Sequence, residues 1–243
     1  MKANFDKIYN ENTPENYFKM YYDLSYHLIK NCSKALKKEL LLVRKRNPLI
    51  LDLCCGYGTL ELELKTNFEL SNYNFAIFKE SYLYNSKSPL NLSKTNYIFI
   101  GVDKAENAVN YALKTKLIDI GITIDIENER VPIKFDEIDI LTCFGGIGYI
   151  TLTGVQNIMK SANSINTFIF TCLESVDCIP IIEYLESNNY SLKKYKKPII
   201  QRNAIDISEL IWFDEVTNNK FINFRKKNEL SIYANLYIAK KIK

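Results

Sequence analysis

The stretch that decides the fold runs from Ile50 to Thr59 and reads Ile-Leu-Asp-Leu-Cys-Cys-Gly-Tyr-Gly-Thr. A short apolar run closed by glycines is typical of a buried parallel strand. Gly56 and Gly58 allow a sharp turn and a close approach to a ligand, because neither has a Cβ atom. A helix after such a turn directs its unpaired N–H groups toward that ligand. The stretch therefore predicts the first strand, turn and helix of a doubly wound nucleotide-binding sheet.

A second run supports this interpretation. The residues from Tyr97 to Val102 are mainly apolar and lead to Asp103, and Glu106 to Lys116 then has the pattern of a helix. An acid at the end of the second strand is where a Rossmann-like fold binds two ribose hydroxyl groups. We therefore expect Asp103 to hold the ribose of a nucleotide-containing ligand.

Two motifs resemble those of the class I S-adenosylmethionine-dependent methyltransferases. The residues from Asp52 to Gly58 are similar to the first motif, D-x-G-C-G-x-G, and those from Gly101 to Val109 to the second, G-x-D-x-S-x-x-A. The resemblance covers roughly residues 49–182. One position departs, because Cys54 stands where the family usually has its first glycine. A small side chain is tolerable there if the turn shifts slightly, which would change how the methionyl end of the cofactor sits.

The resemblance implies S-adenosylmethionine as the co-substrate and a set of residues around it. A third strand is expected at Ile122 to Ile126, and the acid–apolar pair Asp125 and Ile126 at its exit would hold the adenine. A solvated acidic loop is the alternative for this pair. The expected cofactor-binding residues are Asp52, Cys54, Cys55, Gly56, Gly58, Asp103, Lys104, Asp125, Ile126, Phe144 and Gly145.

The fourth strand, Ile138 to Phe144, ends in three glycines within four residues, followed by Tyr149. Glycines let the backbone pass close to another group. In the family this strand end faces the reactive sulfonium and the acceptor, so Tyr149 is our candidate catalytic residue, with a buried core tyrosine as the alternative. The Asn/Asp-Pro-Pro-Tyr motif of enzymes that methylate amino groups of DNA bases or of glutamine is absent here, which argues against those substrates.

The first 46 residues have a helical pattern and are rich in tyrosine. Thr13-Pro14-Glu15 supplies the start signals of a helix, and a second helix is expected from Ser33 to Lys45. The first helix either packs on the sheet or forms a lid over the cofactor, as in the N-terminal caps of many class I methyltransferases. The expected substrate-binding residues are Tyr17, Tyr21, Tyr26, Gly146 and Tyr149.

Residues 47–243 are expected to form one cofactor-binding domain behind this cap. Asp52 and Asp103 lie about 50 positions apart, whereas dinucleotide folds place such a pair about 20–30 apart. Residues 68–95 therefore read as an insertion, either a functional lid or binding loop or an oligomer contact.

The rest of the chain fits the carboxyl-terminal half of the same fold. A fifth strand from Thr167 to Leu173, a helix from Ile179 to Asn188 and extended runs from Tyr190 to Ile200 and from Ser231 to Ala239 follow. The resemblance implies a Rossmann-like, doubly wound α/β sheet of seven strands, mostly parallel, with an antiparallel edge where strand seven lies between five and six. Gln201-Arg202 and Ile207 to Phe213 fall between the last two strands, where substrate loops often form.

Composition limits the possible partners. A chain of 243 residues with 47% hydrophobic content suits one large α/β domain, and a net charge of +4 is too small to indicate nucleic acid. The six cysteines include no C-x-x-C pair and only one histidine is present, so no metal site is expected. The start of the chain lacks the apolar core of a signal peptide, and no apolar stretch reaches the roughly 18 residues of a membrane span. We expect a cytoplasmic monomer or homodimer that acts on a small molecule without contacting a membrane.

The chemistry of the cofactor leaves three functions open. Its methyl group is already activated on a sulfonium, so the protein mainly aligns the acceptor, and aromatic faces attract the sulfonium through cation–π interactions. With His27 as the only histidine, a histidine general base is not expected. We expect methyl transfer to a small molecule rather than to a macromolecule, because the basic surface is weak. One alternative is an enzyme that cyclises S-adenosylmethionine to azetidine-2-carboxylate and releases methylthioadenosine, since known azetidine synthases look like class I methyltransferases. The other is a non-catalytic protein that binds the cofactor.

Overall fold

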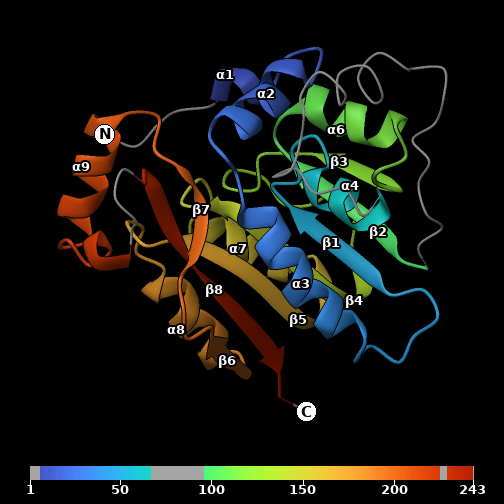
Figure 1. Ribbon diagram of the computed structural model, residues 1–243. Coiled ribbons are helices and arrows are strands. Elements are labelled where there is room, and N and C mark those ends of the chain that lie inside the picture. Colours follow the sequence, from blue (N-terminus) through green and yellow to red (C-terminus); the bar gives the residue numbers. More distant parts are fainter. Residues whose placement is uncertain (1–5, 67–95, 225–228, 243) are drawn as a thin grey trace.

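The computed structural model describes residues 6–66, 96–224 and 229–242, and the insertion expected at 68–95 lies outside them (Figure 1). Its centre is an eight-stranded sheet in the order β3-β2-β1-β4-β5-β8-β6, with β7 paired to β8. The strands are β1 (Leu49–Leu53), β2 (Ile98–Asp103), β3 (Ile120–Thr123), β4 (Phe135–Ile147), β5 (Ala162–Leu173), β6 (Tyr190–Lys194), β7 (Ile199–Asn203) and β8 (Ser231–Lys241).

The sheet has the predicted doubly wound topology. Strands β1 to β5 pair in parallel, whereas β8 runs antiparallel to β5, β6 and β7 and lies between β5 and β6. The predicted number of seven strands was one too few. The run expected to be continuous from Tyr190 to Ile200 is broken near Pro198, which has no N–H to donate to a ladder, and β7 begins after it.

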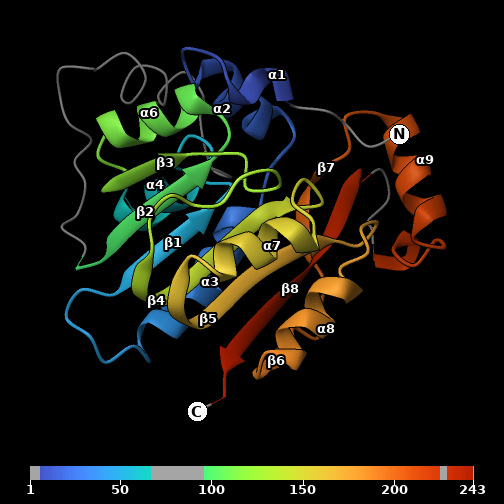
Figure 2. The same cartoon turned by 180° about the vertical axis from the view of Figure 1, so that it is seen from behind.

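Helices cover both faces of the sheet (Figures 1 and 2). They are α1 (Asp6–Tyr9), α2 (Glu15–Asp23), α3 (Leu28–Leu40), α4 (Thr59–Thr66), α6 (Glu106–Lys114), α7 (Leu152–Met159), α8 (Ile179–Ser187), α9 (Ile207–Val216) and the 3-10 helix η3 (Ile222–Phe224). Successive side chains along a strand point to opposite faces of the sheet, which explains the two helical layers. Ile50 packs with α3, α4 and α6, while Leu51 packs with α7 and α8.

Several predicted boundaries were wrong, among them those of the third strand and the second helix. The third strand runs from Ile120 to Thr123 rather than from Ile122 to Ile126, because the chain turns at Asp125, whose carbonyl accepts the N–H groups of Asn128 (3.0 Å) and Glu129 (2.9 Å). The second helix runs from Leu28 to Leu40 rather than from Ser33 to Lys45, because its buried stripe begins at Leu28 and its last buried residue is Leu40.

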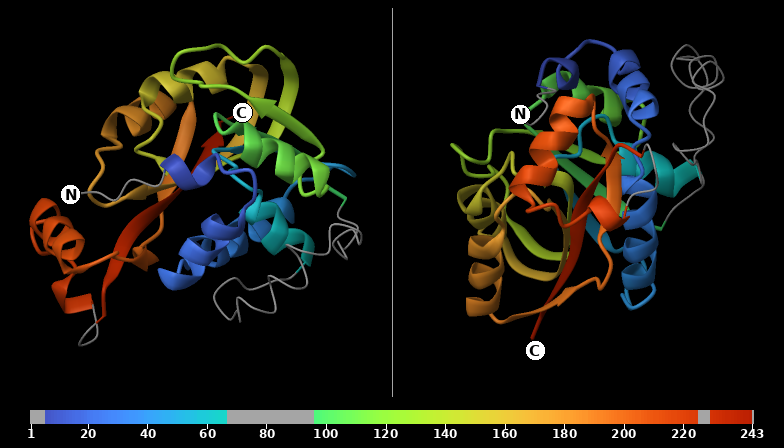
Figure 3. Two further views of the ribbon diagram at one scale, coloured as in Figure 1. Left: turned by 90° about the horizontal axis from the view of Figure 1, so that it is seen from above. Right: turned by 60° about the vertical axis from the view of Figure 1, so that its left-hand side comes forward.

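The amino-terminal helices divide into two groups. Helix α3 packs on the sheet, whereas α1 and α2 lie over the carboxyl ends of the parallel strands. Helix α9 lies at the outer edge of the molecule, far from α4 and α6 (Figure 3). The carboxyl edge under α1 and α2 is therefore where a ligand site is expected in an open α/β sheet.

Candidate functional site

The turn between β1 and α4 is held in left-handed backbone conformations. The φ angles are +61° at Cys54, +53° at Gly56 and +78° at Gly58. Cys54 thus adopts a left-handed conformation that glycine takes more readily, and its N–H donates to the Val102 carbonyl (2.8 Å). A side chain in this region costs about 1–2 kcal/mol, so Cys54 adds local strain that a glycine would not.

Asp103 ties this turn to the end of β2. Its Oδ2 accepts the Gly56 N–H and its Oδ1 accepts the Ala105 N–H, both at 2.9 Å. Burial raises the pKa of this carboxyl above its usual value, against the lowering by these two backbone hydrogen bonds. Each carboxylate oxygen has a second lone pair, so Asp103 can still accept hydrogen bonds from a ligand.

A cavity of about 680 Å³ lies at the carboxyl ends of the parallel strands, within the size range of small-molecule sites. It brings together most of the residues predicted from the sequence: Tyr17, Tyr21, Tyr26, Asp52, Cys54, Cys55, Asp103, Lys104, Asp125, Ile126, Phe144, Gly145, Gly146 and Tyr149. These residues come from four strand ends and from the amino-terminal helices, which the sequence separates by up to 132 positions from Tyr17 to Tyr149.

The two glycines of the first motif are not among the described residues that line this cavity. A Cβ atom on Gly58 would lie 3.1 Å from Leu117 and 3.3 Å from Ala112, and one on Gly56 would lie 3.3 Å from the Tyr17 hydroxyl. The expectation that Gly58 makes room for a ligand is therefore corrected, because it makes room for side chains of the protein itself. Gly56 instead faces Tyr9 and Tyr17, which belong to the lining of the cavity.

Asp52 is a buried acid on the floor of the cavity. Thr142 donates its hydroxyl to Asp52 Oδ1 at 2.5 Å. Burial raises the pKa of Asp52 to about 7, Thr142 lowers it, and the negative charge of Asp103 raises it further. Asp52 therefore changes its charge near neutral pH, in a position where a positively charged ligand group would favour the ionised form.

The turn after β3 forms the far end of the cavity. Asp125 accepts hydrogen bonds from the Glu127 N–H (3.1 Å) and from the Asn128 side-chain amide (3.0 Å). Glu127 in turn accepts the N–H (2.6 Å) and the hydroxyl (2.7 Å) of Thr151, next to the start of α7. This loop is thus a fixed wall, with Ile126 buried beside it.

Tyrosines of the amino-terminal segment form the roof. The Tyr17 hydroxyl donates to the Tyr21 hydroxyl (2.8 Å) and lies 3.4 Å from Thr59 Oγ1. The Tyr21 and Tyr26 rings have centroids 4.0 Å apart, and the Tyr9 and Tyr17 rings 5.1 Å apart. Helix α2 therefore contributes to the core and to the wall of the cavity at once, because Tyr17 is buried and also lines the cavity.

The glycine turn after β4 is fitted to this roof. Gly145 has a φ angle of +83° and donates its N–H to Thr171 Oγ1 (2.8 Å). A Cβ atom on Gly145 would lie 2.7 Å from the Tyr26 hydroxyl, and one on Gly146 would lie 2.7 Å from the sulfur atoms of Cys54 and Cys143. Because this turn has no side chains at Gly145 and Gly146, Tyr26 of the roof and Cys54 of the first-motif turn can each pack closely against it.

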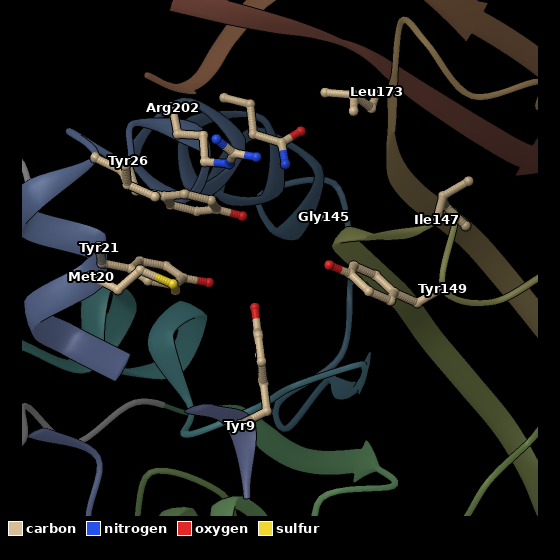
Figure 4. Close-up of a pocket in the computed structure, with 11 residues that line it drawn as sticks. Tyr9, Met20, Tyr21, Tyr26, Gly145, Ile147, Tyr149, Leu173 and Arg202 are labelled. Carbon is tan, nitrogen blue, oxygen red and sulfur yellow. The ribbon is translucent and has the colours of Figure 1, made fainter. Parts of the chain in front are cut away.

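A second, smaller chamber of about 40 Å³ adjoins the cavity beyond this turn. The side chains of Tyr9, Tyr21, Tyr26 and Tyr149 point their hydroxyl groups into it from different sides (Figure 4). These four tyrosines and Gly145 line both spaces, so the chamber is an extension of the cavity at the end of β4. Tyr149, our candidate catalytic residue, is 41% exposed and lies at the junction, so it is not a core tyrosine.

Several lining residues were not predicted as site residues. Tyr9 and Asn10 line the cavity because α1 is tethered to the core: Asn107 donates its side-chain amide to the Asn10 carbonyl (2.9 Å). Gln201 and Arg202, expected near a substrate loop, lie in β7 and line the chamber. The segment from Ile207 to Phe213, expected there too, instead forms most of α9 and lines neither space.

Two negative findings concern the described residues only. In residues 6–66, 96–224 and 229–242, no group of three or more histidine, cysteine or acidic side chains is placed to hold a metal ion. No helix in these ranges is long and apolar enough to cross a membrane.

No protein-family model matches this sequence, and no curated protein sequence matches it. Solved structures do match. Magnesium protoporphyrin IX methyltransferase (ChlM) from Synechocystis PCC 6803, solved with bound S-adenosylmethionine, aligns with a TM-score of 0.51 and 10% identity over 88% of this chain and 79% of that chain. A TehB-like S-adenosylmethionine-dependent methyltransferase from Corynebacterium glutamicum aligns with a TM-score of 0.50 and 14% identity over 93% and 97%.

The YcgJ protein from Bacillus subtilis gives a TM-score of 0.50 and 11% identity over 87% of this chain and 98% of that chain. At these identities the likeness concerns the fold. The chain therefore has the Rossmann-like fold of the class I S-adenosylmethionine-dependent methyltransferases, as its two motifs predicted.

Proposed function

We propose that this chain, which has the fold of the class I methyltransferases, binds S-adenosylmethionine in the 680 Å³ cavity and methylates a small molecule. The observation that carries the proposal is the position of Asp103. Its carboxylate ends β2, lines the cavity, is fixed by two backbone N–H groups and keeps lone pairs for two ribose hydroxyl groups.

The other residues of the cavity fit the remaining parts of this cofactor. Asp125 and Ile126 offer a polar edge and a buried apolar surface for the adenine. Asp52 and Cys54 adjoin the space for the amino-acid end, where an ionised Asp52 would stabilise an ammonium group. Aromatic faces in the roof suit a sulfonium, because a cation over an aromatic ring gains about 0.5–2 kcal/mol.

The bound cofactor would supply an activated methyl group. The protein's own residues would then position the acceptor, exclude water from the reacting atoms and control the charge around the sulfonium. The phenols of Tyr9, Tyr21 and Tyr26 remain neutral, since burial raises the pKa of each above its usual value. They are therefore hydrogen-bonding and cation–π groups rather than bases. Tyr149 is placed to orient the acceptor, because it lies where the cavity meets the chamber.

The net charge of +4 supports a small-molecule acceptor rather than nucleic acid, and we keep the cytoplasmic location and the monomer or homodimer as parts of the proposal. Residues 47–243 would form the cofactor-binding domain, with α1 and α2 as its cap.

The test is the fate of the cofactor. The protein is incubated with S-adenosylmethionine carrying a ¹³C-methyl group, with and without a dialysable metabolite extract, and the products are identified by mass spectrometry. We expect S-adenosylhomocysteine and a ¹³C-methylated small molecule that form only with the extract, and much less of both with Asp103→Asn. Methylthioadenosine formed without the extract would instead favour cyclisation, and binding without consumption would favour a non-catalytic role.

A further inference from the structure

The small chamber has walls from several separate parts of the chain, among them the α2–α3 loop, β7 and the glycine turn after β4. The α2–α3 loop is joined to β7 by backbone hydrogen bonds, from Asn203 N–H to the Leu24 carbonyl (2.7 Å) and from His27 N–H to the Gln201 carbonyl (2.9 Å). These bonds hold the backbone of β7 beside the loop, so that Gln201 and Arg202 line the chamber together with the tyrosines of the roof.

The charge of the chamber is balanced within the protein. Arg202 donates from both terminal nitrogens to the two carboxylate oxygens of Glu209, at 2.9 and 2.7 Å. Glu209 also accepts the Ile205 N–H at 2.8 Å. Both side chains of the pair are buried, with 7% and 5% of their surface exposed. A buried bidentate pair of this kind holds its guanidinium firmly, so Arg202 is not available as the partner of an incoming carboxylate.

One polar atom of the chamber has no partner in the described part of the chain. The side-chain oxygen of Gln201 is buried and accepts no hydrogen bond there. A buried acceptor without a donor costs about 1–3 kcal/mol, so this oxygen favours a ligand that brings an N–H or O–H group. The nearby phenols can donate or accept, and their rings present π faces that attract positive charge.

The size of the chamber restricts the group that enters it. A water-sized group needs roughly 10–15 Å³ of such space, so a chamber of about 40 Å³ accommodates about three non-hydrogen atoms. An aromatic ring or a nucleotide base is too large. The remainder of a larger acceptor would have to lie outside it.

We propose that this chamber binds the amino group of the methyl acceptor, with an acceptor N–H donating to Gln201 Oε1 and the tyrosine rings around the nitrogen. An amine fits all three observations. It brings the donor that Gln201 lacks, its charge is compatible with the π faces, and it needs no free cation, unlike a carboxylate. This inference rests on the proposed function, because it assigns the chamber next to the cofactor cavity to the acceptor.

The experiment uses the full chain loaded with S-adenosylhomocysteine, which lacks the sulfonium charge. Saturation-transfer NMR titrations with ethylamine, ethanol and acetate compare three probes of similar size. We expect ethylamine to bind with a Kd of about 1 mM, the limit for so small a ligand, and acetate and ethanol to bind at least tenfold more weakly. Gln201→Leu should weaken ethylamine at least fivefold and leave the affinity for S-adenosylhomocysteine unchanged. The matched control is Gln156→Leu, on α7 outside both spaces, which should change neither affinity.

The outcomes separate the two proposals. If S-adenosylhomocysteine does not bind, the proposed function fails first. If it binds and ethylamine binds no better than ethanol, or if acetate binds best, the assignment of the chamber to an amine is overturned while the cofactor site stands. If Gln201→Leu and Gln156→Leu affect ethylamine equally, Gln201 is not its partner and the inference is equally overturned.

Discussion

The hydroxyl group of Tyr26 lies directly over Gly145, so closely that a Cβ atom on this glycine would be 2.7 Å from the phenol oxygen. Tyr26 belongs to the loop between α2 and α3, and Gly145 to the end of β4. The contact joins the roof of the site to the strand end that faces both the cavity and the chamber.

This contact gives a prediction about docking of the roof. Gly145→Ala should weaken S-adenosylhomocysteine binding about tenfold, because the methyl group displaces Tyr26 and the φ angle of +83° is unfavourable for alanine. Tyr26→Phe removes the clashing oxygen and should restore part of the loss in the double variant. Calorimetry on the four proteins measures the coupling, and Tyr22→Phe, an exposed tyrosine of α2, is the control. Strictly additive effects would show that the two residues do not meet.

Asp52 gives a prediction about pH. Its folded pKa of about 7 lies above the ordinary value of 3.8, so the folded chain holds an extra proton between about pH 4 and 7. The stability from this protonation is fully present below pH 4 and is lost as pH rises through 7. Asp52→Asn, which can still accept the Thr142 hydroxyl, should therefore become more stable relative to the wild type as pH rises from 5 to 8. Urea unfolding at several pH values measures this difference, which includes the relief of the repulsion that Asp52 exerts on Asp103 and Glu61.

The same acid links cofactor binding to pH. A positively charged ligand beside Asp52 favours its ionised form, so binding of S-adenosylmethionine at pH 6.5 should release protons. Calorimetry in two buffers of different ionisation enthalpy counts them. Asp52→Asn should bind more weakly and release fewer protons. An equal release from both proteins would place the titrating group elsewhere.

Cys54 gives a prediction about backbone strain. Glycine at this position would relieve the left-handed strain but lose the contact with Cys143, so Cys54→Gly should change the free energy of unfolding by no more than about 1 kcal/mol. Cys54→Val places a β-branched side chain at a positive φ and should be less stable than Cys54→Gly by about 1–3 kcal/mol. Equal stability of the two variants in urea would mean that residue 54 does not have this conformation.

The roof gives a prediction about motion. Residues 6–23 are held to the core by side-chain contacts such as the Tyr57 hydroxyl donating to the Glu11 carbonyl (2.7 Å), whereas the loop after them is tied by backbone bonds to β7. We expect this segment to open without cofactor and to close when it binds, so its amide exchange should slow on adding S-adenosylhomocysteine. Equal protection with and without ligand would mean that these helices only pack.

The sequence predicted the parts of the site that local signals determine. Strand β1 lies directly before the glycine turn, as predicted, because apolar runs and glycines act within a few residues, and Asp103 ends the next strand, which pairs with β1. The sequence placed Gln201 near an expected substrate loop but could not assign it to the chamber beside the roof. Its position depends on the pairing of β7 with the loop from Leu24 to His27, and such pairing between distant segments has no local signal.

Two further differences between the predicted and the observed site also arise from tertiary packing. Gly58 was assigned to a ligand because its turn matches the first motif, but its Cβ direction points to Leu117, which only the packing of the region after α6 reveals. The sequence did not predict the left-handed conformation of Cys54, which hydrogen bonds of the turn with Val102 and Asp103 hold on either side. Local chemistry thus predicts which turn exists, and tertiary packing determines which side of it faces the ligand.

The most direct test of the central claim is whether Asp103 binds the ribose of the cofactor. Calorimetry compares S-adenosylhomocysteine with its 2′-deoxy analogue on the wild type, on Asp103→Asn and on Asp119→Asn, an exposed acid outside the cavity lining that accepts the Phe99 N–H instead. A charge-assisted hydrogen bond contributes roughly 1.5–3 kcal/mol, so the wild type and Asp119→Asn should prefer the ribose form at least tenfold. Asp103→Asn should lose most of this preference. A preference that is unchanged in Asp103→Asn would contradict the assignment of this cavity to S-adenosylmethionine.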